Sequence, residues 1–147
     1  MKKLLTVFLA IMVAFSLVAC NPKQVDEKGT ITVVVMQETP LNYTVKLEDL
    51  DLSEGAFSVV KYLNVEKGMS LEYENSVYGA YITKIGDIST DSAGFVSVFT
   101  SVEREWDVTE YCVTKEYNGI TVKSSAIGLS SMSIVEGMVL YFCYIAY

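Results

Sequence analysis

The sequence contains no histidine, and its 147 residues include 11 basic side chains against 18 acidic ones. Without histidine, neither a Ser–His–Asp nor a Cys–His catalytic arrangement can form, and the usual nitrogen ligand of a zinc site is missing. We therefore predict a protein that is not an enzyme and that has no metal site or cofactor of its own. The acidic excess also argues against nucleic acid as a partner, because its phosphates would be repelled.

The first twenty residues have the pattern of an export signal that ends in a lipid-attachment cysteine. Lys2 and Lys3 form a positive start, Leu4 to Val18 form an apolar stretch, and Cys20 follows the small residue Ala19. This arrangement resembles the bacterial lipoprotein box, in which the cysteine thiol receives a diacylglyceryl group and becomes the first residue after cleavage. The alternatives are an unlipidated signal and a transmembrane anchor, for which about 15 apolar residues fall short of the ~20 required.

This interpretation divides the chain into three parts. We expect a lipoprotein signal peptide at residues 1–19, the lipidated cysteine and a short tether at residues 20–29, and one domain at residues 30–147. The first part carries two basic and no acidic side chains, which leaves nine basic against 18 acidic residues and a formal charge of −9. The predicted location is the extracytoplasmic face of the cell membrane, with the lipid on Cys20 as the membrane contact.

Patterns with a period of two and runs of β-branched residues predict that most of the domain is β-structure. Thr30–Met36 and Tyr43–Glu48 are expected to pair as a hairpin. Asn118–Gly119 is the strongest hairpin turn in the sequence and matches a type I′ turn. The later strands are expected at Leu71–Glu74, Tyr78–Gly86, Gly94–Val102, Val108–Tyr117, Ile120–Ser125 and Val139–Tyr147.

One helix is predicted, because four apolar residues from Ala56 to Leu63 follow the i, i+3, i+4, i+7 spacing of a helix face. Asp51 and Ser53 are the candidate N-caps, and Asp51 with Glu54 has capping-box spacing. The helix should end at Lys67–Gly68. Two strands, one helix and then several strands predict an α+β fold, in which one main helix packs on a mostly antiparallel sheet.

Two segments resemble a known family. The helix sequence Ala-Phe-Ser-Val-Val-Lys-Tyr-Leu from Ala56, and Val-Tyr-Gly-Ala-Tyr-Ile-Thr-Lys-Ile-Gly-Asp from Val77, are similar to the transcobalamin C-terminal-like domain family. An aromatic strand at Phe95–Phe99 followed by Trp106, and a closing strand pair after Glu136–Gly137, extend the similarity. The resemblance implies a small β-rich module like the one that covers one face of cobalamin in the vertebrate carriers. It makes a cobalamin-like ligand one candidate.

Aromatic side chains near strand ends are the candidate ligand contacts. Tyrosine and tryptophan at such places suit a flat or sugar-like ligand or a protein partner, and the alternative is that they fill the core of a small β domain. The candidates are Tyr78, Tyr81, Phe99, Trp106 and Tyr111. Carboxylates such as Glu103 and Glu105 are expected on the solvated face of a strand.

Cys112 and Cys143 remain once Cys20 is assigned to lipid. A disulfide between them would close a loop of about 32 residues and stabilise the exported chain by roughly 3–4 kcal/mol. The alternative is a pair of buried free thiols in neighbouring strands. The sequence leaves both open.

Two classes of function fit these features. The first is a binding module that captures a small molecule, such as a corrinoid or a metal complex, at the cell surface. It predicts a concave pocket lined by aromatic side chains. The second is a protein–protein interaction module without a small ligand, which predicts a flat apolar patch or an exposed sheet edge.

Overall fold

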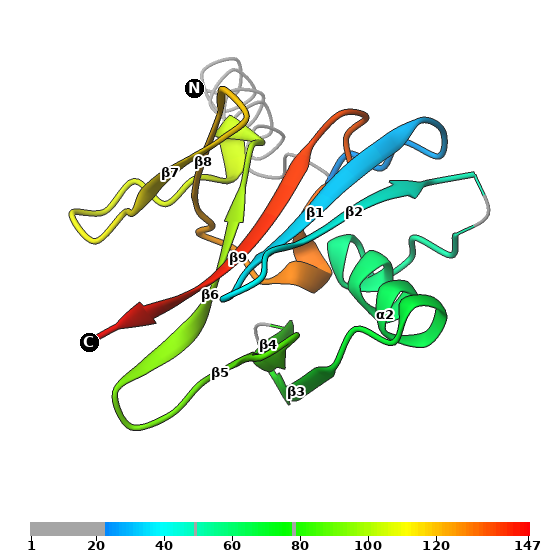
Figure 1. Ribbon diagram of the computed structural model, residues 1–147. Helices are drawn as coiled ribbons and strands as arrows, with labels where there is room; N and C mark the ends of the chain where they lie inside the picture. Colours follow the sequence, from blue (N-terminus) through cyan, green and yellow to red (C-terminus); the bar gives the residue numbers. More distant parts are fainter. Residues whose placement is uncertain (1–22, 49, 78) are drawn as a thin grey trace, which may run out of the picture.

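The computed structural model describes residues 23–48, 50–77 and 79–147, so Cys20 and the rest of the predicted signal lie outside the described residues. Two β-sheets and one α-helix form the described chain (Figure 1), and the predicted α+β class is confirmed. Within these ranges, no helix is long and apolar enough to cross a bilayer. The elements are β1 (Thr30–Met36), β2 (Leu41–Lys46), α2 (Ala56–Lys67), β3 (Leu71–Ser76), β4 (Gly79–Ile85), β5 (Ile88–Ser89), β6 (Gly94–Thr100), η1 (Glu103–Glu105), β7 (Thr114–Tyr117), β8 (Ile120–Ser124), η2 (Leu129–Ser131) and β9 (Val139–Ala146).

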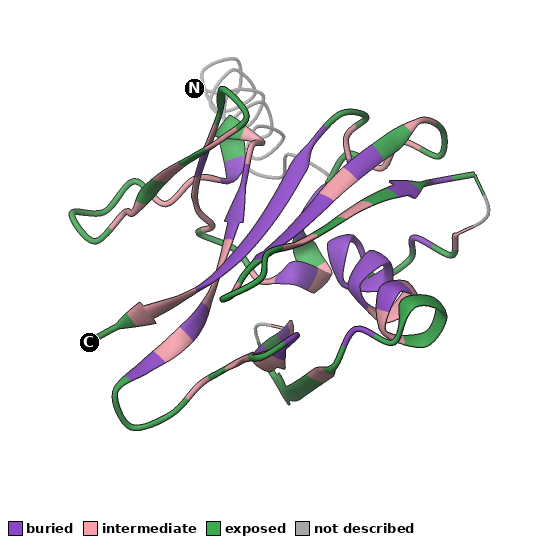
Figure 2. Ribbon diagram, in the orientation of Figure 1, coloured by how far each residue is buried: buried purple, intermediate pink, exposed green. Residues whose placement is uncertain are grey.

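The larger sheet has the strand order β2-β1-β9-β6-β8-β7, and the smaller sheet has the order β3-β4-β5. Neighbouring strands run antiparallel, except that β1 and β9 are parallel. Val33, Val34 and Val35 of β1 are fully buried, so both faces of this strand are covered (Figure 2). A continuous run of valines is typical of a strand in that position.

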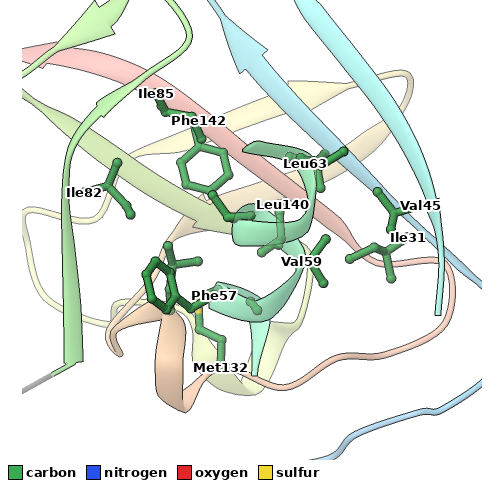
Figure 3. Close-up of a cluster of buried hydrophobic side chains, with 14 of the residues drawn as sticks. Ile31, Val45, Phe57, Val59, Leu63, Ile82, Ile85, Met132, Leu140 and Phe142 are labelled. Carbon is green, nitrogen blue, oxygen red and sulfur yellow. The ribbon is translucent and has the colours of Figure 1, made fainter. Parts of the chain in front are cut away.

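Helix α2 packs on one face of the larger sheet, and the main hydrophobic core lies between them (Figure 3). The four residues of the predicted stripe, from Ala56 to Leu63, are buried against Leu140 and Phe142 of β9. The smaller sheet adds Ile82 and Ile85 of β4 to the same core. Each fully buried side chain of this kind contributes roughly 1.5–3 kcal/mol, so this cluster is the main source of stability.

The start of α2 differs from the prediction. The helix begins at Ala56, and its N-cap is Gly55, with φ 56°, ψ −142° and no side-chain capping bond. Asp51 closes a separate turn, because its Oδ1 accepts a hydrogen bond from the Ser53 N–H at 3.0 Å. That bond lowers the pKa of Asp51. A Cβ on residue 55 would lie 2.5 Å from the Met132 carbonyl oxygen, so close packing against a distant segment places a glycine at the cap.

A second, smaller core covers the opposite face of the larger sheet and includes Phe99, Val122 and Tyr141. The β7–β8 hairpin closes this side. The Tyr117 hydroxyl donates a hydrogen bond to Asn42 Oδ1 at 2.8 Å. Because β7 and β2 are the two edges of the sheet, this bond joins the edges across the second core.

The predicted Asn118–Gly119 turn is confirmed, since φ is 48° at Asn118 and 79° at Gly119. Its strands are shorter than predicted, because residues 108–113 form a loop. Asp107 Oδ1 accepts from the Thr109 N–H at 2.8 Å and turns the chain there. The other predicted strands are present, with ends that move by up to two residues. The sequence did not predict β5, η1 or η2.

The predicted tether is bound to the fold over part of its length. Gln24 O accepts from the Ile134 N–H, and Ile134 O accepts from the Asp26 N–H, both at 2.8 Å. Asp26 Oδ2 also accepts from the Glu136 N–H at 2.8 Å, which lowers the pKa of Asp26. Lys23 Nζ donates to the Ser53 carbonyl oxygen at 2.9 Å. Among the described residues, contacts with the domain are therefore present from Lys23 onward, before the first strand.

Candidate functional site

A groove runs between β4 and β6, and we call it the β4–β6 groove. Two adjoining hollows of about 340 and 290 Å³ form it, and they share Ala80, Tyr81 and Gly128 in their walls. Together they are in the size range of small-molecule sites. The walls come from the end of β3, from β4, from β6 and from the loop at residues 125–129.

The groove exists because two strand edges are left open toward each other. On this side of β4, the two-residue strand β5 pairs only with Lys84 and Ile85. On the facing side of β6, β8 pairs only with Phe99 and Thr100. Thr90 closes one end, because it donates its N–H to Thr83 O at 2.8 Å and its Oγ1 accepts from the Val96 N–H at 3.1 Å.

The loop at residues 125–129 forms a wall of the groove away from Thr90 and is held by several bonds. Ser125 donates its N–H to the Val98 carbonyl oxygen at 3.0 Å. Its Oγ donates to the Ile127 carbonyl oxygen at 2.9 Å and accepts from the Ile127 N–H at 3.2 Å. Leu129 is buried in the main core and fixes the far end of the loop. The wall is therefore preformed.

Glu105 holds this loop through hydrogen bonds from the interior of the protein. This location corrects the prediction that Glu105 lies on the solvated face of a strand. It is buried at the end of η1. Its carbonyl oxygen accepts from the Ala126 N–H at 2.9 Å, and its Oε1 accepts from the Ser133 N–H at 2.8 Å. The alternating pattern fails here because the chain leaves β6 at Thr100 and turns inward.

The groove offers apolar and hydrogen-bonding surface with little charge. Tyr81 is 43% exposed and Ile127 is 38% exposed. Phe95 is half-buried beside them, and its ring packs against Tyr147 at 5.8 Å between centroids. Among the described lining residues, Glu74 carries the only charge. Such a surface suits a flat molecule, uncharged or cationic, that packs on an aromatic ring.

The structure places the predicted aromatic residues in different parts of the molecule. Tyr81 lies in the groove, whereas Tyr78 lies outside the described residues. Phe99 is fully buried and packs edge-on against Tyr141 at 5.7 Å, so it belongs to the second core and offers no surface to a ligand. Alternation shows which face Phe99 occupies but not that the β7–β8 hairpin covers it.

Neither Trp106 nor Tyr111 lines the two hollows of the groove, although Trp106 forms a β-bridge with Ser125 of its wall. Trp106 Nε1 donates to the Thr100 carbonyl oxygen at 2.7 Å, and Lys123 Nζ lies 4.5 Å from its ring centroid. This cation–π contact occupies one face of the ring. Tyr111 is 79% exposed in the loop before β7. Sequence reasoning also missed Phe95 and Ile127 as groove residues, because the groove depends on which strand edges stay unpaired.

Cys112 and Cys143 are separate free thiols in the structure. Cys143 is in β9, and burial raises the pKa of its thiol. Cys112 precedes β7 in a loop rather than lying in a strand beside β9. Cys112 is partly exposed, so the two thiols differ in their access to reagents.

A larger hollow of about 560 Å³ lies between the N-terminal segment and the loop that leads to α2. Charged side chains make up half of its wall, including Lys28, Glu48 and Asp51. Backbone hydrogen bonds lower the pKa of Glu48 and of Asp51, which keeps both carboxylates ionised. Its charge makes this hollow less suited than the groove to a flat apolar ligand. Among the described residues, no three His, Cys, Asp or Glu side chains are grouped to hold a metal ion.

The fold defines a class: an α+β module similar to the transcobalamin C-terminal domain. Haptocorrin in complex with Cbi matches with a TM-score of 0.57 and 13% identity, over 84% of this chain and 26% of haptocorrin. A candidate metal-binding protein from Ruminococcus gnavus matches with a TM-score of 0.52 and 11% identity, over 83% of this chain and 99% of that protein. At these identities the likeness is one of fold. No family model and no curated protein sequence matches the chain.

Proposed function

We propose that the protein is a lipid-anchored binding module on the extracytoplasmic face of the membrane, and that the β4–β6 groove binds its ligand. The observation that carries the proposed ligand site is the position of Tyr81, which lies exposed in the wall shared by the two hollows. A preformed groove with one exposed aromatic ring and little charge is the arrangement expected of a small-molecule site.

The proposed ligand is a corrinoid or another flat metal complex. Two features support this class. The groove walls can pack against a large organic ring system, and haptocorrin, which has a similar fold, was solved with Cbi bound. The protein would hold the organic part of such a ligand, through Tyr81, Phe95 and Ile127.

The alternative, a protein-interaction module without a small ligand, would use an exposed sheet edge. β3 is such an edge, and its residues after Leu71 are all exposed. However, Glu72 and Glu74 place two negative charges along it, and charged side chains on an edge strand oppose the addition of another strand. The charged edge of β3 therefore argues against the interaction module, and the groove, which carries little charge, supports the ligand-binding module.

The anchor is tested by the intact mass of the full-length protein purified from bacterial membranes. We expect residues 1–19 to be absent and Cys20 to carry the added mass of a diacylglyceryl group. The Cys20→Ser variant should lack this mass and leave the membrane fraction. A wild-type protein without lipid would contradict the anchor.

Ligand binding is tested on residues 21–147 with cobinamide as the probe. We expect a one-to-one complex by native mass spectrometry and a change in the cobinamide absorbance spectrum on titration. Divalent metal salts serve as the comparison, because they contain no ring system to pack on Tyr81. If the protein shows no mass shift and no spectral change with cobinamide, the result would contradict the corrinoid proposal and favour the interaction module.

A further inference from the structure

The N-terminal segment and the β4–β6 groove meet at Ser130. Lys23 Nζ lies 3.5 Å from the Ser130 carbonyl oxygen, to which it donates. On the other side, Ser130 Oγ accepts from the Ala80 N–H at 3.4 Å, and a Cβ built on Gly79 would lie 3.2 Å from the Ser130 Cβ. We call the hollow between residues 74–76 of β3, residues 79–81 of β4 and Gly128 the mouth of the groove. The first described residue and this mouth therefore lie at one end of the molecule.

This end of the molecule is close to the predicted lipid. Cys20 precedes Lys23 by three residues, which span at most about 11 Å when fully extended. The bonds of Gln24 and Asp26 to Ile134 fix the chain beyond that point. A lipid on Cys20 would therefore hold this end near the bilayer, rather than let the domain tumble on a long linker.

Apolar side chains are exposed at the same end. Val77, in the turn between β3 and β4, is 93% exposed and lies two residues from Gly79. Tyr81 and Ile127 are exposed in the groove walls. Moving such a valine out of water is favourable, and tyrosine is suited to the boundary between headgroups and acyl chains.

We propose that Val77 and the mouth of the β4–β6 groove face the lipid surface. The proposal rests on the anchoring at Cys20 that is proposed above. The partner surface is a zwitterionic one such as phosphatidylcholine, because an acidic domain is repelled by anionic headgroups.

The test supplies the anchor artificially, so it does not depend on lipidation. Residues 21–147 with an N-terminal hexahistidine tag are attached to phosphatidylcholine nanodiscs that contain a nickel-chelating lipid. A gadolinium-chelating lipid then marks the bilayer surface, and methyl NMR measures the relaxation enhancement at Val77 and Ile127. Val108 is the matched control, since it is 94% exposed in the loop before β7.

We expect the enhancement at Val77 and Ile127 to be several times that at Val108. The Val77→Asp variant should reduce the enhancement at Ile127, and Val108→Asp should leave it unchanged, with thermal unfolding used to show that both variants fold. An enhancement at Val108 that equals or exceeds that at Val77 would overturn the proposal. Because the tag replaces the lipid, that result would leave the anchor to the separate intact-mass test.

Discussion

Replacing Gly55 with alanine is expected to lower the free energy of unfolding by about 3–5 kcal/mol, which combines the strain of a backbone conformation that favours glycine with overpacking. Gly55 has φ 56°, and a Cβ there would lie 2.5 Å from the Met132 carbonyl oxygen and 3.1 Å from that of Ser130. These are backbone atoms, so the clash cannot be relieved by turning a side chain. Either α2 or η2 must move, and both support the groove wall.

The matched control is Gly68→Ala at the other end of the same helix. Gly68 also has a positive φ, 64°, but a Cβ there meets nothing within 4 Å. Its substitution should therefore cost only the backbone strain, about 1–2 kcal/mol. Thermal unfolding followed by circular dichroism should show a Tm lowered by roughly 10–25 °C for Gly55→Ala. Equal losses for the two variants would show that the contact with Met132 does not matter.

The Tyr81→Ala variant is expected to weaken cobinamide binding by roughly 5–30-fold, because a central aromatic contact is worth about 1–2 kcal/mol. Tyr81 lies in the wall common to both hollows, so its ring would contact a ligand in either. As Tyr81 is partly exposed on β4, its removal should leave the fold intact. The measurement is an absorbance titration with thermal unfolding as the check on folding.

Tyr111→Ala is the control for this prediction. Tyr111 is also a predicted aromatic contact, but it is 79% exposed in a loop that lines neither hollow. Its substitution should leave the dissociation constant within about twofold. Equal losses from Tyr81→Ala and Tyr111→Ala would place the ligand outside the groove.

Local sequence predicted those elements whose structure depends on local chemistry. The β-branched run Thr30–Met36 is a strand with the predicted ends, and Asn118–Gly119 makes the predicted turn. The helix start was wrong because Asp51 and Ser53 satisfy the local rules for a cap, whereas the cap at Gly55 depends on Met132, far along the chain. Propensity cannot show such a contact.

Of the five proposed aromatic contacts, Tyr81 lies in the groove and Tyr78 lies outside the described residues. The groove itself depends on β5 and β8 being too short to pair with the whole of β4 and β6. A pattern of alternating residues indicates a strand and its faces, not which edges remain open. For the same reason the sequence left open whether Phe99 is a ligand contact or a core residue, and the β7–β8 hairpin covers its face.

The most direct test of the proposed site maps bound cobinamide on residues 21–147 by backbone amide NMR. We predict chemical-shift changes concentrated at residues 79–82, 95–98 and 125–129, which line the β4–β6 groove. Changes centred on residues 47–53, in the wall of the charged hollow, or no changes at saturating cobinamide, would contradict the proposed site.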